Sequence, residues 1–317
     1  MIDRRLRVLQ AIGRHRTLTA AAEACRLTPS AVSHQMQALA RELDVTLLEP
    51  VGRGVRLTPA ARTLLSHAGV LTAQWEQAQA ELATHRAGGI TGPLRFCAFS
   101  TAAAVVVPLA LSQLQDRYPG LTVQLREAEP ASAFEMLSAG DADIAVVVVT
   151  PDVPPLSDPG FDTEQLYVEP LDVLLGPQLP LAGREAIALA DLATDPWIVG
   201  TPGRAYHQLV TVACIGAGFA PRVVHHADEW DTGAALVARG FGVALVPRLA
   251  NLPAHHDTRR IPITGDPAPT RHVVAAVRAG SGHQPGITAG LDALRHVARD
   301  VVSGCPAATP AGRRGGS

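Results

Sequence analysis

The stretch that most constrains the fold of this chain is residues 17–43, TLTAAAEACRLTPSAVSHQMQALAREL. It predicts two short helices joined by a tight polar turn. The first is a small-residue run of high helix propensity that follows Thr19. The second begins at Thr28-Pro29, since threonine suits a helix cap and proline tolerates the first helical position. The alanines of the first helix allow it to pack closely beneath the second.

The second helix of this pair is amphipathic. Its apolar residues recur at spacings of four, three and four, and we expect them to face inward: Val32, Met36, Leu39 and Leu43. The opposite face carries short polar side chains and a few long donors, which suit the base edges and phosphates of a DNA major groove. The candidate DNA-binding residues on this helix are Thr28, Pro29, Ser30, Ser33, His34, Gln37 and Arg41.

The two helices alone fit an alanine-rich helical hairpin about as well as a DNA-binding unit. The next segment favours DNA binding. Two short apolar runs flank Gly52-Arg53-Gly54, which predicts a β-hairpin with a basic tip. A hairpin that follows a helix pair is typical of a winged helix-turn-helix, and it places Arg53 at the minor groove or the DNA backbone.

Residues 1–65 closely resemble the DNA-binding domain of LysR-type transcriptional regulators. The matching segments are Leu6-x-x-Leu9, Thr19-x-Ala21-Ala22-Glu23, Thr28-Pro29-Ser30-Ala31-Val32-Ser33-His34-Gln35, Leu39-x-x-Glu42-Leu43-x-Val45-x-Leu47 and Gly52-Arg53-x-Val55-x-Leu57-Thr58. The chain departs from the family pattern at Asp44, where glycine is usual, and at Pro50, where arginine is usual. The missing cation at Pro50 implies weaker phosphate contact through the hairpin.

A long helix is predicted from Thr58-Pro59 to about Arg86. Its apolar positions are spaced four, three, four, three, four, which is a heptad seam. The seam consists of Leu64, Ala68, Leu71, Trp75, Ala78 and Leu82. Packing on its own chain is the simpler alternative, but nearly three heptads favour a coiled coil between two copies. The resemblance implies that this helix makes the dimer and that tetramers form; a dimer would place two recognition helices about one DNA turn apart.

Residues 87–93 break the long helix and mark a hinge. The chain then alternates strands and helices, which predicts an open α/β sheet. The strands are expected at 94–99, 121–127, 144–149, 173–175, 197–199, 223–226, 240–247 and 273–277. The helices are expected at 100–118, 130–139, 204–216, 232–239 and 286–302.

This second half resembles the effector-binding domain of the same family, which is similar to periplasmic solute-binding proteins. The segments that carry the resemblance are Tyr118-Pro119-x-Leu121-x-Val123, Gly140-Asp141-x-Asp143-Ile144-Ala145, Leu189-x-Asp191-Leu192, Gly218-Phe219-x-Pro221 and Val237-Ala238-x-Gly240-x-Gly242-Val243. The expected fold class is therefore α/β with an α-rich N-terminal domain. The expected parts are a winged helix-turn-helix domain (1–58), a linker and dimerisation helix (59–88), a two-lobed effector domain (91–303) and a disordered tail (304–317). Lobe I would take 91–166 and 267–303, lobe II 167–266, with hinges near 165–170 and 262–270.

Ligands of open α/β sheets bind beyond the carboxyl ends of strands, near helix N-termini. Six residues occupy such positions and are the candidate effector-binding set: Ser100, Thr101, Glu129, Thr150, Thr201 and Arg204. Hydroxyls with free N–H groups favour a small anion such as a carboxylate, and Arg204 could pair with it. Helix capping is the alternative role of Ser100 and Thr201; the resemblance favours Ser100, Thr101 and Thr201 as ligand contacts.

Charge is unevenly distributed along the chain. Residues 1–65 hold ten arginines and five acidic residues, a formal charge of +5, whereas the whole chain carries −2. Such asymmetry is expected when one end of a protein binds a polyanion. No apolar run approaches the roughly 20 residues of a membrane span, and no signal-peptide pattern opens the chain. We therefore expect a cytoplasmic protein without a membrane partner.

Catalysis, cofactors and metals find little support in the sequence. The pairs His225-His226 and His255-His256 are adjacent rather than four residues apart on a helix. The four cysteines are widely scattered without metal-ligand spacing and are expected to be small buried residues, with a redox role of Cys214 left open. No catalytic triad or phosphate loop is present, so we expect neither an enzyme nor a cofactor or metal site.

The sequence thus predicts a bacterial transcriptional regulator that binds two-fold-related DNA as a dimer or tetramer and responds to a small, anionic effector. Its expected partners are double-stranded DNA, further copies of itself, the effector and RNA polymerase. A transport protein would need a signal peptide and would carry no winged helix-turn-helix. A DNA-binding regulator whose C-terminal domain is a ligand-free interaction module remains the alternative.

Overall fold

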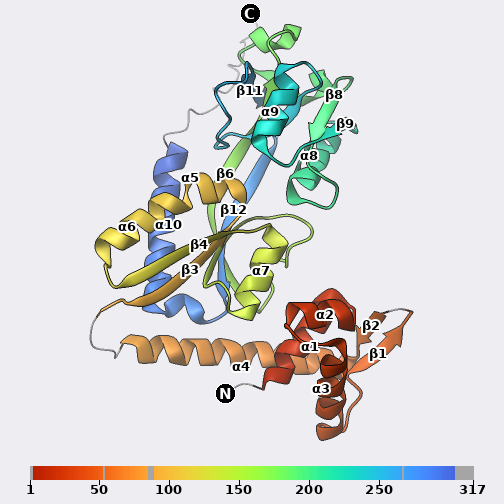
Figure 1. Ribbon diagram of the computed structural model, residues 1–317, viewed down its shortest axis with the longest axis vertical. Coiled ribbons are helices and arrows are strands. Elements are labelled where there is room, and N and C mark those ends of the chain that lie inside the picture. Colours follow the sequence, from red (N-terminus) through yellow and green to blue (C-terminus); the bar gives the residue numbers. More distant parts are fainter. Residues whose placement is uncertain (1–2, 53, 85–88, 266–267, 304–317) are drawn as a thin grey trace, which may run out of the picture.

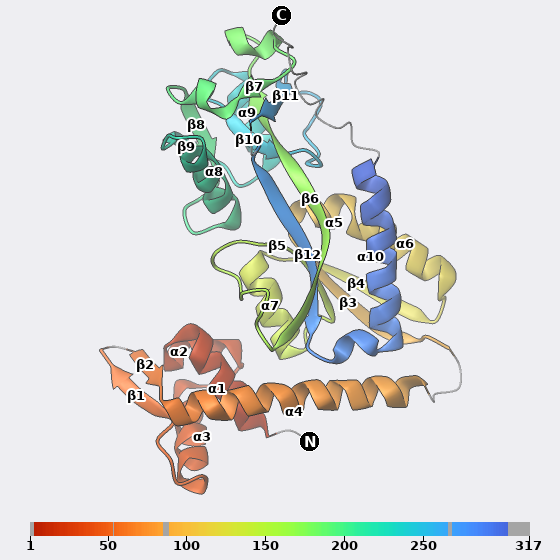
Figure 2. The same cartoon turned by 180° about the vertical axis from the view of Figure 1, so that it is seen from behind.

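The computed structural model describes residues 3–52, 54–84, 89–265 and 268–303. It consists of a small helical head, one long helix and a two-lobed α/β domain (Figure 1). The long helix runs across one end of the two-lobed domain and carries the head beside it (Figure 2). None of the described helices combines the length and the hydrophobicity that a membrane-spanning segment requires.

The head contains three helices and a hairpin: α1 (Arg4–His15), α2 (Leu18–Ala24), α3 (Pro29–Glu42), β1 (Leu48–Val51) and β2 (Gly54–Leu57). The two helices predicted between residues 17 and 43 are confirmed. Helix α2 is capped by Thr17, whose hydroxyl accepts a hydrogen bond from the Ala20 amide, so the helix begins before Thr19. Helix α3 is capped by Thr28, with Pro29 at its first turn as predicted.

The apolar face of α3 packs on α1 and α2. Val32, Met36 and Leu39 are buried, as the spacing predicted. Leu43 was expected to face inward, but it is 43% exposed because α3 ends there and the backbone turns away. The next residue, Asp44, has a φ of +52°, the left-handed conformation that favours glycine. This explains why glycine is usual at that position in the family that the head resembles.

The hairpin pairs antiparallel from Leu48 opposite Leu57 to Val51 opposite Gly54. It is joined to α1 because the Val55 amide donates to the Arg16 carbonyl at 2.9 Å. A Cβ at Gly54 would lie 2.7 Å from that carbonyl oxygen, so only glycine permits this approach. The tip residue Arg53 lies outside the described residues.

Helix α4 (Pro59–Thr84) begins where Thr58-Pro59 predicted, and the Thr58 hydroxyl accepts from the Ala61 amide at 3.1 Å. Its predicted last turn and part of the predicted hinge fall in 85–88, outside the described residues. One face of α4 packs on the two-lobed domain. Glu76 accepts from Arg278 Nε at 3.1 Å and from Gln284 Nε2 at 2.9 Å. At Gly280, where φ is +79°, a Cβ would lie 2.1 Å from the Ala73 carbonyl oxygen.

Lobe I is built from β3 (Gly92–Ala98), β4 (Leu121–Glu127), β5 (Ile144–Val148), α5 (Ser100–Val105), α6 (Val107–Arg117), α7 (Pro130–Ala139) and α10 (Pro285–Ser303). Strand β3 lies parallel between β4 and β5, and β5 is buried throughout, as expected. The single helix predicted over 100–118 divides at Val106 into α5 and α6. The cause is Pro108, which has no N–H to continue the helical hydrogen bonds.

Lobe II is built from β7 (Ile187–Ala188), β8 (Pro196–Val199), β9 (Arg222–His226), β10 (Ala244–Pro247), β11 (Arg259–Thr264), α8 (Ala205–Gly216) and α9 (Trp230–Ala238), with short 3-10 turns at Pro180–Gly183 and Leu189–Leu192. Its core surrounds Trp197, which is fully buried. Strand β11 was not predicted, because two arginines and Pro262 mask its alternation of buried residues.

Two long strands, β6 (Phe161–Leu175) and β12 (Thr270–Arg278), join the lobes (Figure 2). The sheet order is β4-β3-β5-β12-β6-β11-β7, with β10 also paired to β6, so one eight-stranded sheet runs through both lobes. The prediction of a strand limited to 173–175 is wrong, since β6 begins at Phe161. The polar residues of 162–169 hid a strand that pairs with β12, with Pro170 opposite Thr270.

Candidate functional site

The polar face of α3 is open to solvent. Ser30, His34, Gln37 and Arg41 are exposed, and Ser33 is half-buried. Their described hydrogen bonds are local: Gln37 Nε2 lies 3.5 Å from the Ser33 hydroxyl, and Arg41 Nε donates to the Gln37 carbonyl at 3.3 Å. Thr28 and Pro29 are also exposed at the start of the helix. Apart from Thr28, whose hydroxyl caps α3, these groups can therefore contact a duplex without breaking a described hydrogen bond to another element of the head.

Some residues of the predicted seam of α4 are buried within the chain, and others are exposed to solvent. Leu71, Trp75 and Leu82 are 53%, 46% and 62% exposed in the single chain. Leu64 packs against the core of the head, Ala68 is buried, and Ala78 is half-buried. Large apolar side chains left in solvent on one helix are a candidate surface for a second copy. The dimerisation set stays a prediction.

A cleft of about 570 Å³, counting the part that is open to solvent, lies between the lobes. Four residues of the predicted effector set line it: Ser100, Thr101, Glu129 and Arg204. Ser100 and Thr101 open α5 after β3, and Glu129 precedes α7 after β4. The carboxyl ends of neighbouring parallel strands thus bring together residues that are far apart in the sequence, as expected for this kind of sheet.

Arg204 of lobe II bridges the cleft. It donates to Glu129 of lobe I at 2.9 Å, and its Nε lies 3.5 Å from Asp228 Oδ2. The Thr201 amide and hydroxyl donate to Asp228 at 2.8 and 2.9 Å. Burial raises the pKa of Asp228, but the two Thr201 hydrogen bonds and the Arg204 charge outweigh it, so the pKa lies below its ordinary value.

Arg271 forms the buried wall of the cleft, and sequence reasoning missed it. Arg271 is 5% exposed, and its guanidinium carbon lies 4.9 Å from the centre of the Phe99 ring. Arg271 Nε donates to Glu169 Oε2 at 2.7 Å, and the Leu249 amide donates to the other Glu169 oxygen at 2.6 Å. The available signal was an arginine just before the apolar run 273–277, since fully buried arginines are rare.

Two buried threonine hydroxyls have no hydrogen-bond partner among the described residues. Thr101, 3% exposed, lies in the cleft wall, whereas Thr150, 8% exposed, is not among the residues that line the cleft. Thr201 also lies outside the lining, where it contacts Asp228. The assignments of Thr150 and Thr201 to the effector site stay predictions.

The three described cysteines lie in separate parts of the molecule. Cys97 in β3 and Cys214 in α8 are fully buried, and burial raises the pKa of both thiols to about 12. Cys25, directly after α2, is half-buried, and burial raises its pKa too. A reactive thiol is exposed and has a lowered pKa. These three thiols are buried or half-buried, and their pKa values are raised. Cys305 lies outside the described residues.

Comparison with known proteins defines the class. Residues 4–62 match the model of bacterial regulatory helix-turn-helix proteins of the LysR family, and residues 87–299 match the LysR substrate-binding domain. A helix-turn-helix head joined to a substrate-binding domain makes this a DNA-binding transcriptional regulator with an effector-binding domain. The chain belongs to the LysR family, whose members are transcription regulators and not enzymes.

Relatives and solved structures match most of the chain. The probable hydrogen peroxide-inducible genes activator of Streptomyces viridosporus is 32% identical over 308 residues, which cover 93% of this chain and 94% of that protein. The regulator AlsR of Bacillus subtilis is 30% identical over 233 residues, covering 73% and 75%. The Corynebacterium glutamicum OxyR C206 mutant has a TM-score of 0.61 at 24% identity, covering 94% of this chain and 92% of that one. Full-length CbnR, solved with its target DNA, has a TM-score of 0.56 at 21% identity, covering 93% and 99%.

Proposed function

We propose that this regulator binds two-fold-related operator DNA as a dimer, with α3 of each copy in a major groove and Arg53 contacting the minor groove or the DNA backbone. The exposed seam of α4 pairs the two copies, and dimers associate further into tetramers. A small anionic effector, such as a carboxylate, binds in the cleft between the lobes. RNA polymerase is the partner through which such a regulator acts on transcription.

The observation that carries the effector proposal is the pairing of Thr101 and Arg271 in one cleft. The Thr101 hydroxyl is buried without a partner among the described residues, and an unmade buried hydrogen bond is costly. Arg271 brings a buried positive charge to the same wall. A carboxylate would accept from both groups and would give the Thr101 hydroxyl the partner that it lacks among the described residues.

Binding in the cleft is coupled, in this proposal, to the DNA-binding head through α4. Arg204 and Glu129 join the lobes across the cleft, and a bound anion competes with Glu129 for Arg204. Lobe I in turn contacts α4 at Glu76. The effector shifts the lobes only as far as its affinity differs between open and closed arrangements. A change in footprint length on a fixed operator at saturating effector would report this coupling.

The names of several relatives point to hydrogen peroxide as the inducing signal in those proteins. In this chain we favour an anionic effector over peroxide, because the Cys97 and Cys214 thiols are buried and have raised pKa values, which makes them unreactive. The two signals can be distinguished by their chemistry. An anion binds reversibly in the cleft, whereas peroxide oxidises a thiol covalently.

The test is a thermal-shift screen of the full chain against small carboxylates and amino acids, with a parallel hydrogen peroxide arm. A ligand at one hundred times its Kd stabilises the folded state by about 2.7 kcal/mol. We expect such a ligand to raise Tm in the wild type, but not in Thr101→Val. A response to peroxide alone, with a thiol oxidised, would overturn the anion proposal. No response in either arm would favour the ligand-free interaction module.

A further inference from the structure

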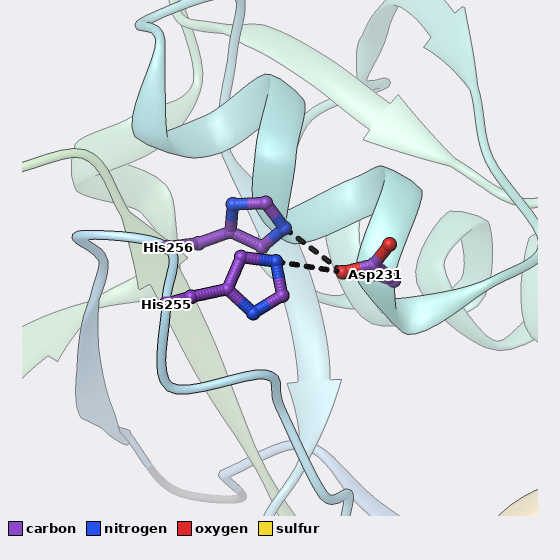
Figure 3. A group of neighbouring side chains, drawn as sticks. All are labelled: Asp231, His255 and His256. Carbon is purple, nitrogen blue, oxygen red and sulfur yellow. Dashed lines mark hydrogen bonds and ion pairs between the residues drawn. The ribbon is translucent and has the colours of Figure 1, made fainter.

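Three side chains in lobe II meet at a place that the effector proposal does not use. Asp231 lies in the first turn of α9, and His255 and His256 are adjacent in the loop between β10 and β11 (Figure 3). Both imidazoles point their Nε2 atoms at one carboxylate oxygen, Asp231 Oδ1. The distances are 2.9 Å from His256 and 3.4 Å from His255. All three potential ligand atoms lie within 4.8 Å of one another.

These separations suit a single bound cation. Imidazole nitrogen and carboxylate oxygen lie about 2.0–2.2 Å from a zinc-class ion. Two such ligands at angles of 90–110° are then about 2.9–3.5 Å apart. The two nitrogen-to-oxygen distances at Asp231 lie in this range.

Simple ion pairing explains the arrangement less well. The two ring centres are only 4.0 Å apart, so two protonated imidazoles would repel each other. Their shared partner is one carboxylate that is 65% exposed, and such surface pairs contribute little. Two neutral imidazoles can instead direct their lone pairs at one divalent ion without that repulsion.

The loop that carries the histidines is held in place by other contacts. Arg260 donates to the carbonyls of Arg248 and Ala250, each at 2.6 Å. Leu252 packs against the same buried cluster as Trp230, the neighbour of Asp231. His256 is only 18% exposed, so its ring is partly fixed. The ligand atoms therefore need little rearrangement to receive an ion.

We propose that Asp231, His255 and His256 form a binding site for a divalent cation of the zinc class, with water completing the coordination. Two nitrogen ligands favour zinc, nickel, cobalt or copper over magnesium and calcium, which prefer oxygen. The ion ties the loop after β10 to the start of α9, whose Trp230 lines the effector cleft. The site itself does not depend on the effector proposal.

The test uses the untagged full chain and competition for Zn²⁺ with a chromogenic chelator, together with Co²⁺ absorption spectra. We expect one ion per chain, and at least a tenfold loss of affinity in Asp231→Ala, His255→Ala and His256→Ala. His296→Ala is the matched control, because His296 makes an exposed pair with Asp300 at 3.5 Å and has no third potential ligand within the described part of the chain. Its Zn²⁺ affinity should equal that of the wild type.

His255 is 69% exposed, so His255→Ala should fold normally, and far-UV circular dichroism will verify this. Equal Zn²⁺ affinity in wild type, His255→Ala and Asp231→Ala would overturn the site. So would a Co²⁺ spectrum dominated by thiolate charge transfer, since the metal would then sit at a cysteine. Absence of any stoichiometric Zn²⁺ binding by the wild type would also overturn it.

Discussion

Arg204 and Glu129 form a hydrogen-bonded ion pair of 2.9 Å across the cleft between the lobes. Their side chains are 48% and 46% exposed, so the pair contributes at most about 1 kcal/mol. A contact of this strength can hold the lobes in one arrangement and still yield to a ligand. Glu129 thus forms an ion pair with Arg204, the same cation that an anionic effector would bind.

Replacing Glu129 should strengthen effector binding. In Glu129→Gln the internal carboxylate is gone, so Arg204 is more available and repulsion of an anion falls. We expect a several-fold lower Kd for the anion found in the thermal-shift screen, measured by isothermal titration calorimetry. Arg204→Gln, the matched partner change, should raise Kd. Weaker binding by Glu129→Gln would show that this carboxylate helps to hold the ligand.

Removing Arg271 should destabilise the protein strongly. Arg271→Met leaves Glu169, which is 2% exposed, without its cation, and such losses cost about 3–5 kcal/mol. Urea unfolding measures the change. The double variant Arg271→Met/Glu169→Gln should recover part of the stability, because the glutamine oxygen can still accept from the Leu249 amide. A single variant within 1 kcal/mol of wild type would be incompatible with a buried ion pair here.

Asp228 should make stability depend on pH at the acid end. Its pKa is lower in the folded chain than its ordinary value of 3.8. The stabilisation from ionised Asp228 is therefore complete above pH 3.8 and is lost as pH falls through the lowered folded-state value. Asp228→Asn should be less stable than wild type by a constant amount from pH 7 to about 5, and this gap should narrow below pH 3.8. Urea unfolding across this series tests it; a gap that widens in acid would contradict the assignment.

Local patterns in the sequence predicted the head well. The Thr-Pro starts at residues 28–29 and 58–59 and the spacing of Val32, Met36 and Leu39 are near-neighbour signals, and the structure confirms them. Strand β6 was largely missed, because Asp162, Thr163, Glu164 and Gln165 are polar and exposed or half-buried, and only pairing with β12 makes this segment a strand. Pairing between strands a hundred residues apart leaves no local pattern.

The cleft shows the same division between local and distant signals. Ser100, Thr101, Glu129 and Arg204 were predicted from strand ends and do line it. Arg271 was missed because its role depends on Glu169 and Phe99, which reach it only through the fold. A metal site at His255 and His256 was not predicted for a similar reason, because the third potential ligand, Asp231, lies on a different element.

The exposed seam of α4 should be the surface that pairs two copies. Trp75→Glu places a charge where the proposed coiled coil excludes water, so the dimer should dissociate at least tenfold more readily. Sedimentation equilibrium measures this dissociation. Gln79→Glu is the control, because Gln79 is exposed outside the seam and its change adds the same charge. Dissociation in both variants alike, or in neither, would place the dimer contact elsewhere.

The central claim is that two copies of α3 read a two-fold-related DNA site. The most direct measurement is sequencing of genomic fragments that the purified full chain retains against excess random competitor. The account predicts enrichment of a motif with two related half-sites spaced about one helical turn apart, or a multiple of it, and loss of that enrichment in His34→Ala. Retention without sequence preference, or enrichment of a lone half-site, would contradict it.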